Sequence, residues 1–214
     1  IILILTKDTS VNMNPIKDLF NEINCGVPIW FLRQAGRHIP EYFEIRNKEK
    51  DFINFCLNEK LIIESTKLPL KYYDIDAAII FSDILMVPWA MNRNVRFESG
   101  IGPLLDPMEK ASDLEEDVLR DLSSKLQPVG KAISLTRAAL PDKTALIGFA
   151  GAPWTLITYM AEGGSSRDFA KARLWAWQDK TALDGLLEIL IEATVQFLII
   201  QAKAGADALM LFDS

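Results

Sequence analysis

The sequence predicts an α/β fold in which short strands of a parallel sheet alternate with helices. Three observations support this class. Four short runs are almost continuously apolar, at residues 27–32, 75–81, 145–149 and 206–212. Such runs are typical of parallel strands that are buried on both faces. Helical patterns occupy the intervals between the runs, and polar residues gather directly after each run.

The helices are predicted from apolar residues that recur at helical spacing. Four stretches show this pattern, at residues 51–72, 114–122, 129–140 and 181–204. Pro69 interrupts the first stretch, and Ser112 with Asp113 gives a start signal for the second. The last stretch stops at Gly205, because glycine readily adopts the left-handed conformation that ends many helices.

Four strand–helix steps amount to half of an eight-fold barrel, which usually needs about 250 residues. We therefore predict a (β/α)8 TIM-type barrel that is incomplete in this chain, with about the first four β/α units present. Residues 92–107 are predicted to form a hairpin-like excursion from the core. We expect one domain over residues 1–214, in which residues 1–14 are disordered or spurious, since the chain starts with an apolar run and no Met.

The composition narrows the class of protein. The 214 residues are 50% hydrophobic and 24% charged, which is typical of a soluble globular protein. The net charge of −6 disfavours sequence-independent nucleic-acid binding, which depends on Lys and Arg. Cys25 and Cys56 form no CxxC or CxxH pair and are expected to be reduced, buried thiols of a cytoplasmic protein. No run is long enough to span a membrane, and a signal peptide is not expected.

Polar residues follow each predicted strand. The first is followed by residues 33–38 (RQAGRH), the second by 82–83 (SD), the third by 150–155 (AGAPWT) and then Tyr159, and the fourth by 213–214 (DS). In parallel α/β folds, ligands bind at the carboxyl ends of the strands. Two arginines beside a carboxylate suit a polyanionic ligand that also presents N–H groups or develops positive charge.

Four longer blocks carry a resemblance to a known family. Residues 28–42 read PIWFLRQAGRHIPEY, residues 81–88 read FSDILMVP, residues 147–165 contain IGFAGAPWTL, YM and EGGS, and residues 204–214 contain AGADA and LFDS. In this order and at this spacing, the blocks resemble the signatures of uroporphyrinogen decarboxylase. The resemblance runs from about residue 15 to residue 214. His38, where the family usually has Tyr, and Trp89, where a smaller polar residue is common, depart from its pattern.

The resemblance implies a distorted (β/α)8 barrel that acts as a cytoplasmic homodimer when full length, without metal or organic cofactor. It implies the conversion of the four acetate side chains of uroporphyrinogen III to methyls, with release of CO2, to give coproporphyrinogen III. The family continues past the serine of the fourth block with the rest of the barrel and a late active-site histidine. We therefore expect the 214-residue chain by itself to be inactive and poorly soluble or partly folded.

The resemblance also implies roles for individual residues. Arg33 and Arg37 are expected to meet substrate carboxylates, and Arg37 is either a proton relay or a carboxylate anchor. Asp83 is expected to accept hydrogen bonds from pyrrole N–H groups and to stabilise a cationic intermediate. Tyr159 and Ser214 are expected to line the cleft. The candidate catalytic residues are therefore Asp83, Arg37 and Tyr159, and Phe81 joins these and Arg33 and Ser214 as a candidate substrate contact.

Other interpretations stay open from the sequence. Arg33 and Arg37 could close an ordinary surface loop, Asp83 could cap a helix, and Tyr159 could be a packed aromatic residue. A corrinoid- or folate-linked methyltransferase of the same superfamily is one alternative function, which would require zinc held by His and Cys. An inactive tetrapyrrole-binding fragment is another.

Overall fold

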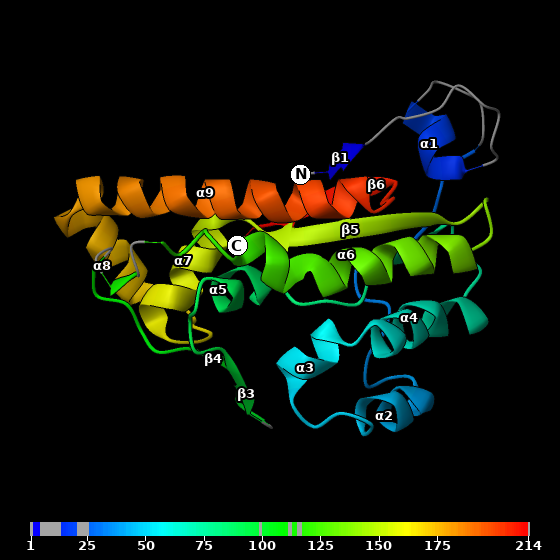
Figure 1. Ribbon diagram of the computed structural model, residues 1–214, viewed down its shortest axis with the longest axis horizontal. Coiled ribbons are helices and arrows are strands. Elements are labelled where there is room, and N and C mark those ends of the chain that lie inside the picture. Colours follow the sequence, from blue (N-terminus) through cyan, green and yellow to red (C-terminus); the bar gives the residue numbers. More distant parts are fainter. Residues whose placement is uncertain are drawn as a thin grey trace. The chain divides into compact units, whose positions relative to one another are not determined.

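The computed structural model describes residues 2–4, 14–20, 26–98, 100–110, 113–114 and 117–213 (Figure 1). It confirms the α/β class. The strands are β1 (Ile2–Ile4), β2 (Ala77–Ile79), β3 (Arg96–Glu98), β4 (Gly102–Leu104), β5 (Ala145–Gly151) and β6 (Ala208–Phe212). The helices are α1 (Pro15–Phe20), α2 (Pro40–Arg46), α3 (Phe52–Leu57), α4 (Glu59–Lys67), the 3-10 helix η1 (Leu68–Lys71), α5 (Met86–Ala90), α6 (Leu122–Ala139), α7 (Pro153–Glu162), α8 (Ala170–Gln178) and α9 (Lys180–Lys203).

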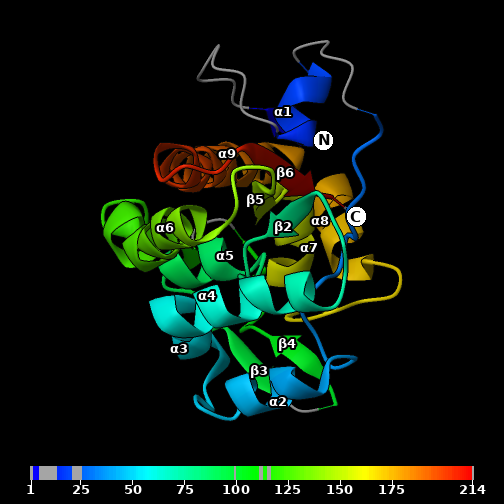
Figure 2. The same ribbon diagram turned by 90° about the vertical axis from the view of Figure 1, so that its right-hand side faces the viewer.

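The main sheet has the strand order β1-β6-β5-β2, and Figure 2 shows β6, β5 and β2 in this order. β2 pairs with β5 in parallel, with Ala77 opposite Ala145 and Ile79 opposite Ile147. β1 pairs with β6 antiparallel. All seven residues of β5 are buried, as a central strand covered on both faces requires. Three of the four predicted strands are therefore confirmed, at β2, β5 and β6.

The first predicted strand, over residues 27–32, is wrong. The segment has no strand structure, and the side chains of Val27, Ile29 and Leu32 are largely exposed. It contacts the start of β2 through Ile29, whose N–H donates to Asp76 Oδ2 at 2.7 Å and whose carbonyl accepts from the Asp76 N–H at 2.8 Å. The edge of β2 that faces away from β5 is hydrogen-bonded to a side-chain amide, that of Gln34, instead of to a neighbouring strand.

The predicted helix over 51–72 is divided into α3, α4 and η1. Asp51 caps the start of α3, where its Oδ1 accepts from Asn54 N–H at 2.7 Å. The division between α3 and α4 lies at Asn58, whose Oδ1 accepts from Leu61 N–H at 3.2 Å and so satisfies a backbone donor that a continuous helix would have used internally. Pro69 lies within η1, where the helix tightens and ends.

The predicted helix over 114–122 is also wrong within the described residues. Residues 117–121 form turns. α6 begins at Leu122, continues through Pro128 and ends at Ala139, so it includes all but the last residue of the helix predicted over 129–140. The expected start signal has another use, because Asp113 Oδ2 accepts from the preceding N–H groups of Glu109 and Lys110 at 3.0 and 3.2 Å.

The last helix and the hairpin agree with expectation. α9 ends at Lys203, two residues before Gly205, which has a φ of +102°. β3 and β4 pair antiparallel within the predicted excursion 92–107. Of the segment 1–14, residues 2–4 form β1 and Asn14 is buried, and the others lie outside the described residues. Cys56 is fully buried, whereas Cys25 also lies outside the described residues.

The chain divides into two compact units, each assembled from three segments. Unit 1 contains residues 1–82, 127–149 and 198–210, and unit 2 contains residues 83–126, 150–197 and 211–214. Unit 1 has a hydrophobic cluster between α2, α3 and α4, against which Ala35 and Phe81 pack. In unit 2, the chain after the hairpin joins α7, since Leu105 N–H donates to Gly163 O at 3.0 Å and Met108 N–H to Met160 O at 2.8 Å.

Within the part of the chain that the structure describes, no helix is both long and apolar enough to cross a membrane.

Candidate functional site

The two arginines of unit 1 lie on an exposed segment between buried anchors. Arg33 and Arg37 are exposed, whereas Gln34 is 5% exposed and Ile39 is 2% exposed. A turn closes the segment, with Ile39 N–H donating to Gly36 O at 3.1 Å. The segment therefore holds two guanidinium groups at the surface of unit 1 while Gln34 and Ile39 are fixed to the core.

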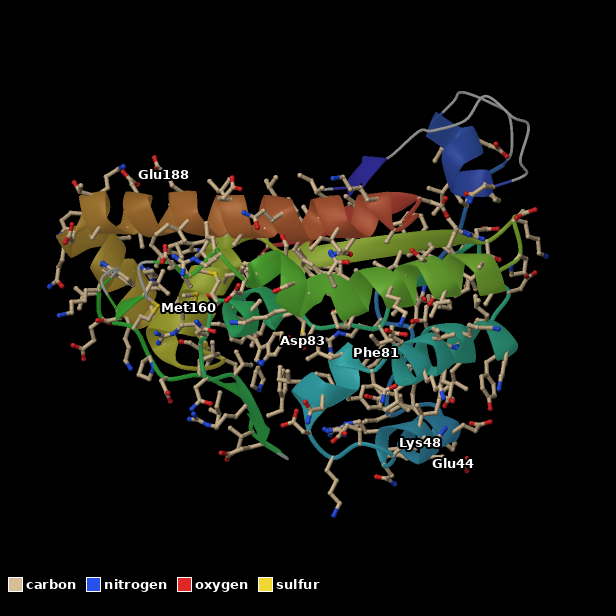
Figure 3. All side chains as sticks on the ribbon, viewed as in Figure 1. Glu44, Lys48, Phe81, Asp83, Met160 and Glu188 are labelled. Atoms are coloured by element: carbon tan, nitrogen blue, oxygen red, sulfur yellow. The ribbon has the colours of Figure 1, made fainter. Side chains whose placement is uncertain are left out.

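Phe81, labelled in Figure 3, belongs to an aromatic cluster of unit 1. Its ring centroid lies 5.2 Å from Phe55, 5.8 Å from Tyr42 and 6.2 Å from Phe52. Burial raises the pKa of Tyr42, and the positive charges of Arg46 and Arg37 partly oppose this. Phe81 and Tyr42 therefore share one aromatic cluster of unit 1.

Asp83 lies in the turn between β2 and α5, in unit 2. Its Oδ1 accepts the Leu85 N–H at 2.8 Å, which is the pattern of an Asx-turn. Burial raises the pKa of the Asp83 carboxyl to about 6, and the hydrogen bond from Leu85 lowers it only in part. The residue as a whole is partly exposed, so the raised pKa reflects a carboxyl group that is poorly hydrated and not one sealed from solvent.

The carboxyl ends of β5 and β6 are joined within unit 2. Ala152 N–H donates to Phe212 O at 2.8 Å, and Thr155 Oγ1 donates to Asp213 Oδ1 at 3.0 Å. At Gly151, a β-carbon would lie 3.1 Å from Cβ of Ile84, so the turn that carries Asp83 approaches the end of β5 closely. Glycine permits this approach because it has no side chain.

Tyr159 lies on α7, one turn after Thr155, and is partly buried. Residues four apart lie on the same face of a helix, so Tyr159 and the Thr155–Asp213 pair share one face of α7. Ser214 lies outside the described residues. Within unit 2, the turn of Asp83 and the end of β6 therefore meet at the end of β5, where α7 begins.

The candidate residues thus fall into two sets. Unit 1 holds Arg33, Arg37 and Phe81, and unit 2 holds Asp83 and Tyr159. The convergence of the two sets on one ligand stays a prediction.

The glycine-rich motif after α7 serves the fold. Gly163 ends α7 with a φ of +82°, and Gly164 forms a bridge with Leu104. Glu162 Oε1 accepts the N–H groups of Lys171 and Ala172 at the start of α8, at 2.8 and 3.1 Å. These contacts are enough to explain the composition of the turn, and no ligand is needed to account for it.

The structure adds three residues that are not candidates by sequence, namely Gln34, Thr155 and Asp213. Gln34 is next to Arg33, Asp213 is next to Ser214, and Thr155 precedes Tyr159 by one helical turn. Their hydrogen bonds fix the segments that carry the candidates. Thr155 and Asp213 could have been found from the sequence, because both belong to the polar residues that follow predicted strands. Gln34 gave no signal of its own, because a glutamine close to two arginines is expected to be exposed.

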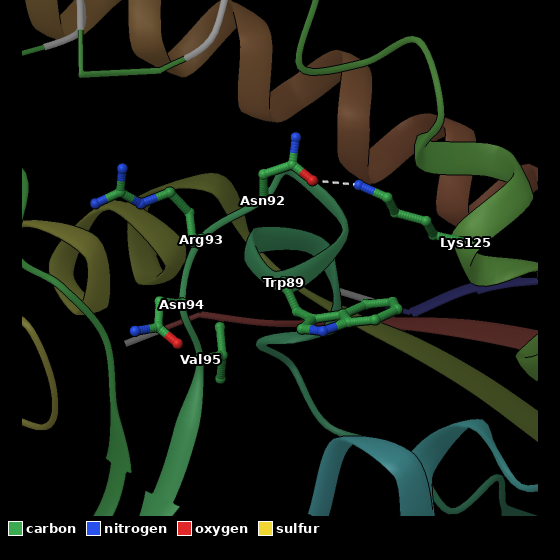
Figure 4. A pocket seen from close by; sticks show the side chains of 6 residues that line it. All are labelled: Trp89, Asn92, Arg93, Asn94, Val95 and Lys125. Carbon is green, nitrogen blue, oxygen red and sulfur yellow. Dashed lines mark hydrogen bonds between the residues drawn. The ribbon is translucent and has the colours of Figure 1, made fainter.

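A separate pocket of unit 2 lies beside the hairpin (Figure 4). It is lined by Trp89, Asn92, Arg93, Asn94, Val95 and Lys125. Lys125 Nζ donates to Asn92 Oδ1 and, at 3.1 Å, to Ala90 O, and Arg93 donates to the carbonyls of Asp106 and Asp113. In Figure 4 the Lys125 side chain extends toward Asn92, whereas the Arg93 guanidinium extends away from both. The described residues do not include a group of three or more His, Cys, Asp or Glu that could hold a metal ion.

Comparison with known proteins identifies the family. The family model described as uroporphyrinogen decarboxylase (URO-D) matches residues 22–214. A uroporphyrinogen decarboxylase from Rhodospirillum rubrum is 47% identical over 187 residues, which are 87% of this chain and 54% of the relative. One from Brucella melitensis biotype 2 is 43% identical over 204 residues, 95% of this chain and 60% of the relative. The chain therefore spans little more than half the length of these relatives.

A solved structure supports the fold class. A methyltransferase from Methanosarcina mazei superposes with a TM-score of 0.65 over 91% of this chain and 56% of its own, at 15% sequence identity. At this identity the likeness concerns the fold alone. The family model and the curated relatives, in contrast, cover most of the chain, and the relatives do so at high identity. The chain therefore belongs to the uroporphyrinogen decarboxylase family.

Proposed function

We propose that the protein converts the acetate side chains of uroporphyrinogen III to methyls, with release of CO2, to give coproporphyrinogen III. The observation that carries the proposal is the under-solvated carboxylate of Asp83, in a chain that also presents two exposed arginines on one anchored segment. The relatives bear the name of this activity. A carboxylate of raised pKa gains much from a nearby cation, and two guanidinium groups suit a substrate with eight carboxylates.

Arg33 and Arg37 are proposed to hold substrate carboxylates. Arginine stays charged at any relevant pH and offers a planar fork that can bind a carboxylate through two hydrogen bonds. Both side chains are exposed in unit 1, so their donors are accessible to a ligand. Phe81, in the aromatic cluster next to this segment, is proposed to supply an apolar contact for the macrocycle.

Asp83 is proposed to act at the centre of the macrocycle. Its carboxylate would accept the pyrrole N–H groups, and it would be stabilised most when the ring carries positive charge. Because burial raises the pKa to about 6, the group is mostly ionised near neutral pH and yet poorly hydrated. Such a carboxylate binds a cationic intermediate more tightly than the neutral substrate, which is what lowers a barrier.

The reaction balances without an oxidant or reductant. A proton first adds to the pyrrole carbon next to the one that bears the acetate, which makes the ring cationic and places positive charge on the carbon that bears the acetate. The bond between the acetate CH2 and its carboxylate then breaks, CO2 leaves, and the electron pair neutralises the ring. A second proton adds to the resulting CH2 group, and loss of the first proton restores the pyrrole with a methyl group. Arg37 is proposed either to anchor a carboxylate or to relay a proton.

The remaining roles are proposed on the same basis. Tyr159 and Ser214 would line the cleft, and no cofactor or metal is proposed. The full-length protein is proposed to be a (β/α)8 barrel that acts as a cytoplasmic homodimer. The Thr155–Asp213 hydrogen bond of 3.0 Å supports the placement of Tyr159, because it fixes the helix face on which Tyr159 lies to the end of β6.

The test uses the protein as its gene encodes it, with uroporphyrinogen III under anaerobic conditions. We expect coproporphyrinogen to form, and Asp83→Asn to lower kcat/KM by a factor on the order of 10² to 10³, as loss of one transition-state contact does. Asp184→Asn is the matched control, because Asp184 is exposed and pairs with Lys180 on the surface of α9. Equal activity in Asp83→Asn and the control would contradict the role of Asp83.

The alternatives differ in what the same protein would do. A methyltransferase would bind zinc and transfer a methyl group to a thiol without releasing CO2. The superposition with a methyltransferase does not favour this function, because it reflects the fold alone at 15% identity. A folded protein that binds uroporphyrinogen and releases no CO2 would instead indicate a binding role.

A further inference from the structure

The side-chain amide of Gln34 occupies the edge of β2 where a neighbouring strand would otherwise pair. Its Nε2 donates to Ala77 O at 2.8 Å, and its Oε1 accepts from Ile79 N–H at 2.8 Å. The residue is 5% exposed and lies close to two exposed arginines. Both hydrogen bonds join it to β2, which lies 43 and 45 residues further along the chain.

The geometry reproduces one step of a parallel sheet. In a parallel pair, one residue donates its N–H to the carbonyl before the residue opposite it and accepts from the N–H after it. Ala77 O and Ile79 N–H flank Ala78 in this manner, so the amide of Gln34 takes the place of a residue opposite Ala78. The other edge of β2 is used by β5, through Asp76 O and Ile80 N–H.

This bonding fixes position 34 of an otherwise exposed segment to the sheet. Arg33 precedes the anchor directly, and Arg37 follows it by three residues, within the turn from Gly36 to the buried Ile39. A side chain that must supply both a donor and an acceptor allows one orientation only. The backbone that carries the two arginines is therefore held in register with β2.

We propose that Gln34 is a positioning residue, whose amide sets where Arg33 and Arg37 present their guanidinium groups to substrate carboxylates. The proposal rests on the proposed function for the nature of the ligand. The anchor itself rests on the contacts of Gln34 alone, so the two can fail separately.

The chain offers a matched control in Gln201. This side chain is also buried, its Nε2 donates to Phe149 O at 2.8 Å, and its Oε1 accepts from Phe149 N–H at 2.8 Å. Gln201 lies on α9 in the interior, and no arginine occurs within three residues of it in the sequence. Methionine has nearly the volume of glutamine and lacks the amide, so Gln34→Met and Gln201→Met each remove two buried hydrogen bonds with little change in packing.

The kinetic test compares the two variants with uroporphyrinogen III as substrate. We expect both to lower Tm. Gln34→Met is expected to raise KM about tenfold with kcat within about threefold, because misplaced arginines weaken binding of substrate and transition state alike. Gln201→Met is expected to leave KM unchanged. A rise in KM of similar size in both variants would overturn the proposal, since it would then reflect stability alone.

A double-mutant cycle and hydrogen exchange complete the test. In an Arg33→Ala background, Gln34→Met is expected to lower kcat/KM less than in the wild type, because part of what it positions is gone. Peptides that cover residues 29–39 are expected to exchange faster in Gln34→Met and not in Gln201→Met. A wild-type protein without turnover would refute the proposed function, whereas unchanged exchange over 29–39 would refute the anchor itself.

Discussion

The amino-terminal ends of β5 and β6 contrast with their carboxyl-terminal ends in how charge is handled. At the amino-terminal ends, in unit 1, Arg137 Nη1 lies 2.7 Å from Asp207 Oδ2, and the side chains are 22% and 4% exposed. The same carboxylate oxygen accepts the Leu146 N–H at 2.8 Å, and Arg137 also donates to Thr144 O at 2.7 Å. The charges are thus paired and surrounded by further hydrogen bonds.

At the carboxyl-terminal ends, in unit 2, the surroundings of one carboxylate differ. Asp83, in the turn after β2, accepts the N–H of its own turn, and among the described residues no basic side chain offsets the burial that raises its pKa. A buried carboxylate without a cation is costly for the fold.

The difference separates charges that stabilise the fold from charges that are suited to a ligand. An ion pair whose donors and acceptors already form several hydrogen bonds has none left to bind a ligand. A carboxylate with a raised pKa gains from any cation or N–H donor that arrives, which is why such groups are often found at functional sites. Removal of Asp207 should therefore lower the free energy of unfolding, whereas neutralisation of Asp83 should raise it near neutral pH.

The largest effect is expected for Asp207→Ala. It would leave the partly buried Arg137 without its carboxylate and the Leu146 N–H without an acceptor. We expect a loss of about 3 kcal/mol in the free energy of unfolding, measured by urea denaturation. Asp184→Ala, which breaks a surface pair on α9, is the control and should change stability by less than about 0.5 kcal/mol. Equal losses in the two variants would show that the pair of Arg137 and Asp207 stabilises the fold no more than a surface pair does.

The next effect is the pH dependence that Asp83 contributes. Its pKa is about 6 in the folded protein, above the ordinary value of 3.8. Between these values the unfolded chain has released a proton that the folded chain keeps, so the free energy of unfolding falls as pH rises, and it levels off above about 6. The loss amounts to about 3 kcal/mol.

Asp83→Asn is expected to remove this fall in stability. Urea denaturation of wild type and variant between about pH 4 and pH 7 measures it as a difference, so that other carboxylates cancel. The variant should be the more stable protein near neutral pH while being the less active one. Parallel stability curves for the two proteins would show that Asp83 is not held in an unfavourable state.

A smaller effect is expected for Gly148→Ala, at the centre of β5. A β-carbon there would collide with Oε1 of Gln201 and lie 3.0 Å from Leu209. Gln201 cannot move away without breaking its two hydrogen bonds to Phe149. We expect a loss of about 1–3 kcal/mol, measured by thermal and urea denaturation.

Gly185→Ala is the counterpart and the smallest effect. Gly185 lies within α9, and a β-carbon added there would have no atom of another residue within 4 Å beyond its own stretch of helix. Alanine favours the helix by about 1 kcal/mol relative to glycine, so the variant should be slightly more stable in the same denaturation experiments. A destabilised Gly185→Ala would indicate that this face of α9 is covered in the folded protein.

Much of the fold and the candidate site follows from local sequence features. The apolar runs that became β2, β5 and β6, and the helical period that became α9, are local patterns and were predicted closely. The polar residues after these strands were predicted for the same reason, since the end of a strand can be read from its neighbours. The helix expected at 114–122 failed because the start signal of Asp113 serves the preceding turn.

The sequence by itself determined the strand–helix alternation at β2, β5 and β6 and the positions of Asp83 and Tyr159 after two of these strands, because each depends on residues close in the chain. Arg33 and Arg37, in contrast, follow a segment that the sequence predicts as a strand and that is not one. Only the tertiary structure decided which neighbour the edge of β2 has, and that Arg137 and Asp207, 70 residues apart, form a pair. Residues 27–32 are not a strand because the amide of Gln34 already occupies that edge. Hydrogen bonds between distant residues depend on the assembled fold, and no local pattern records them.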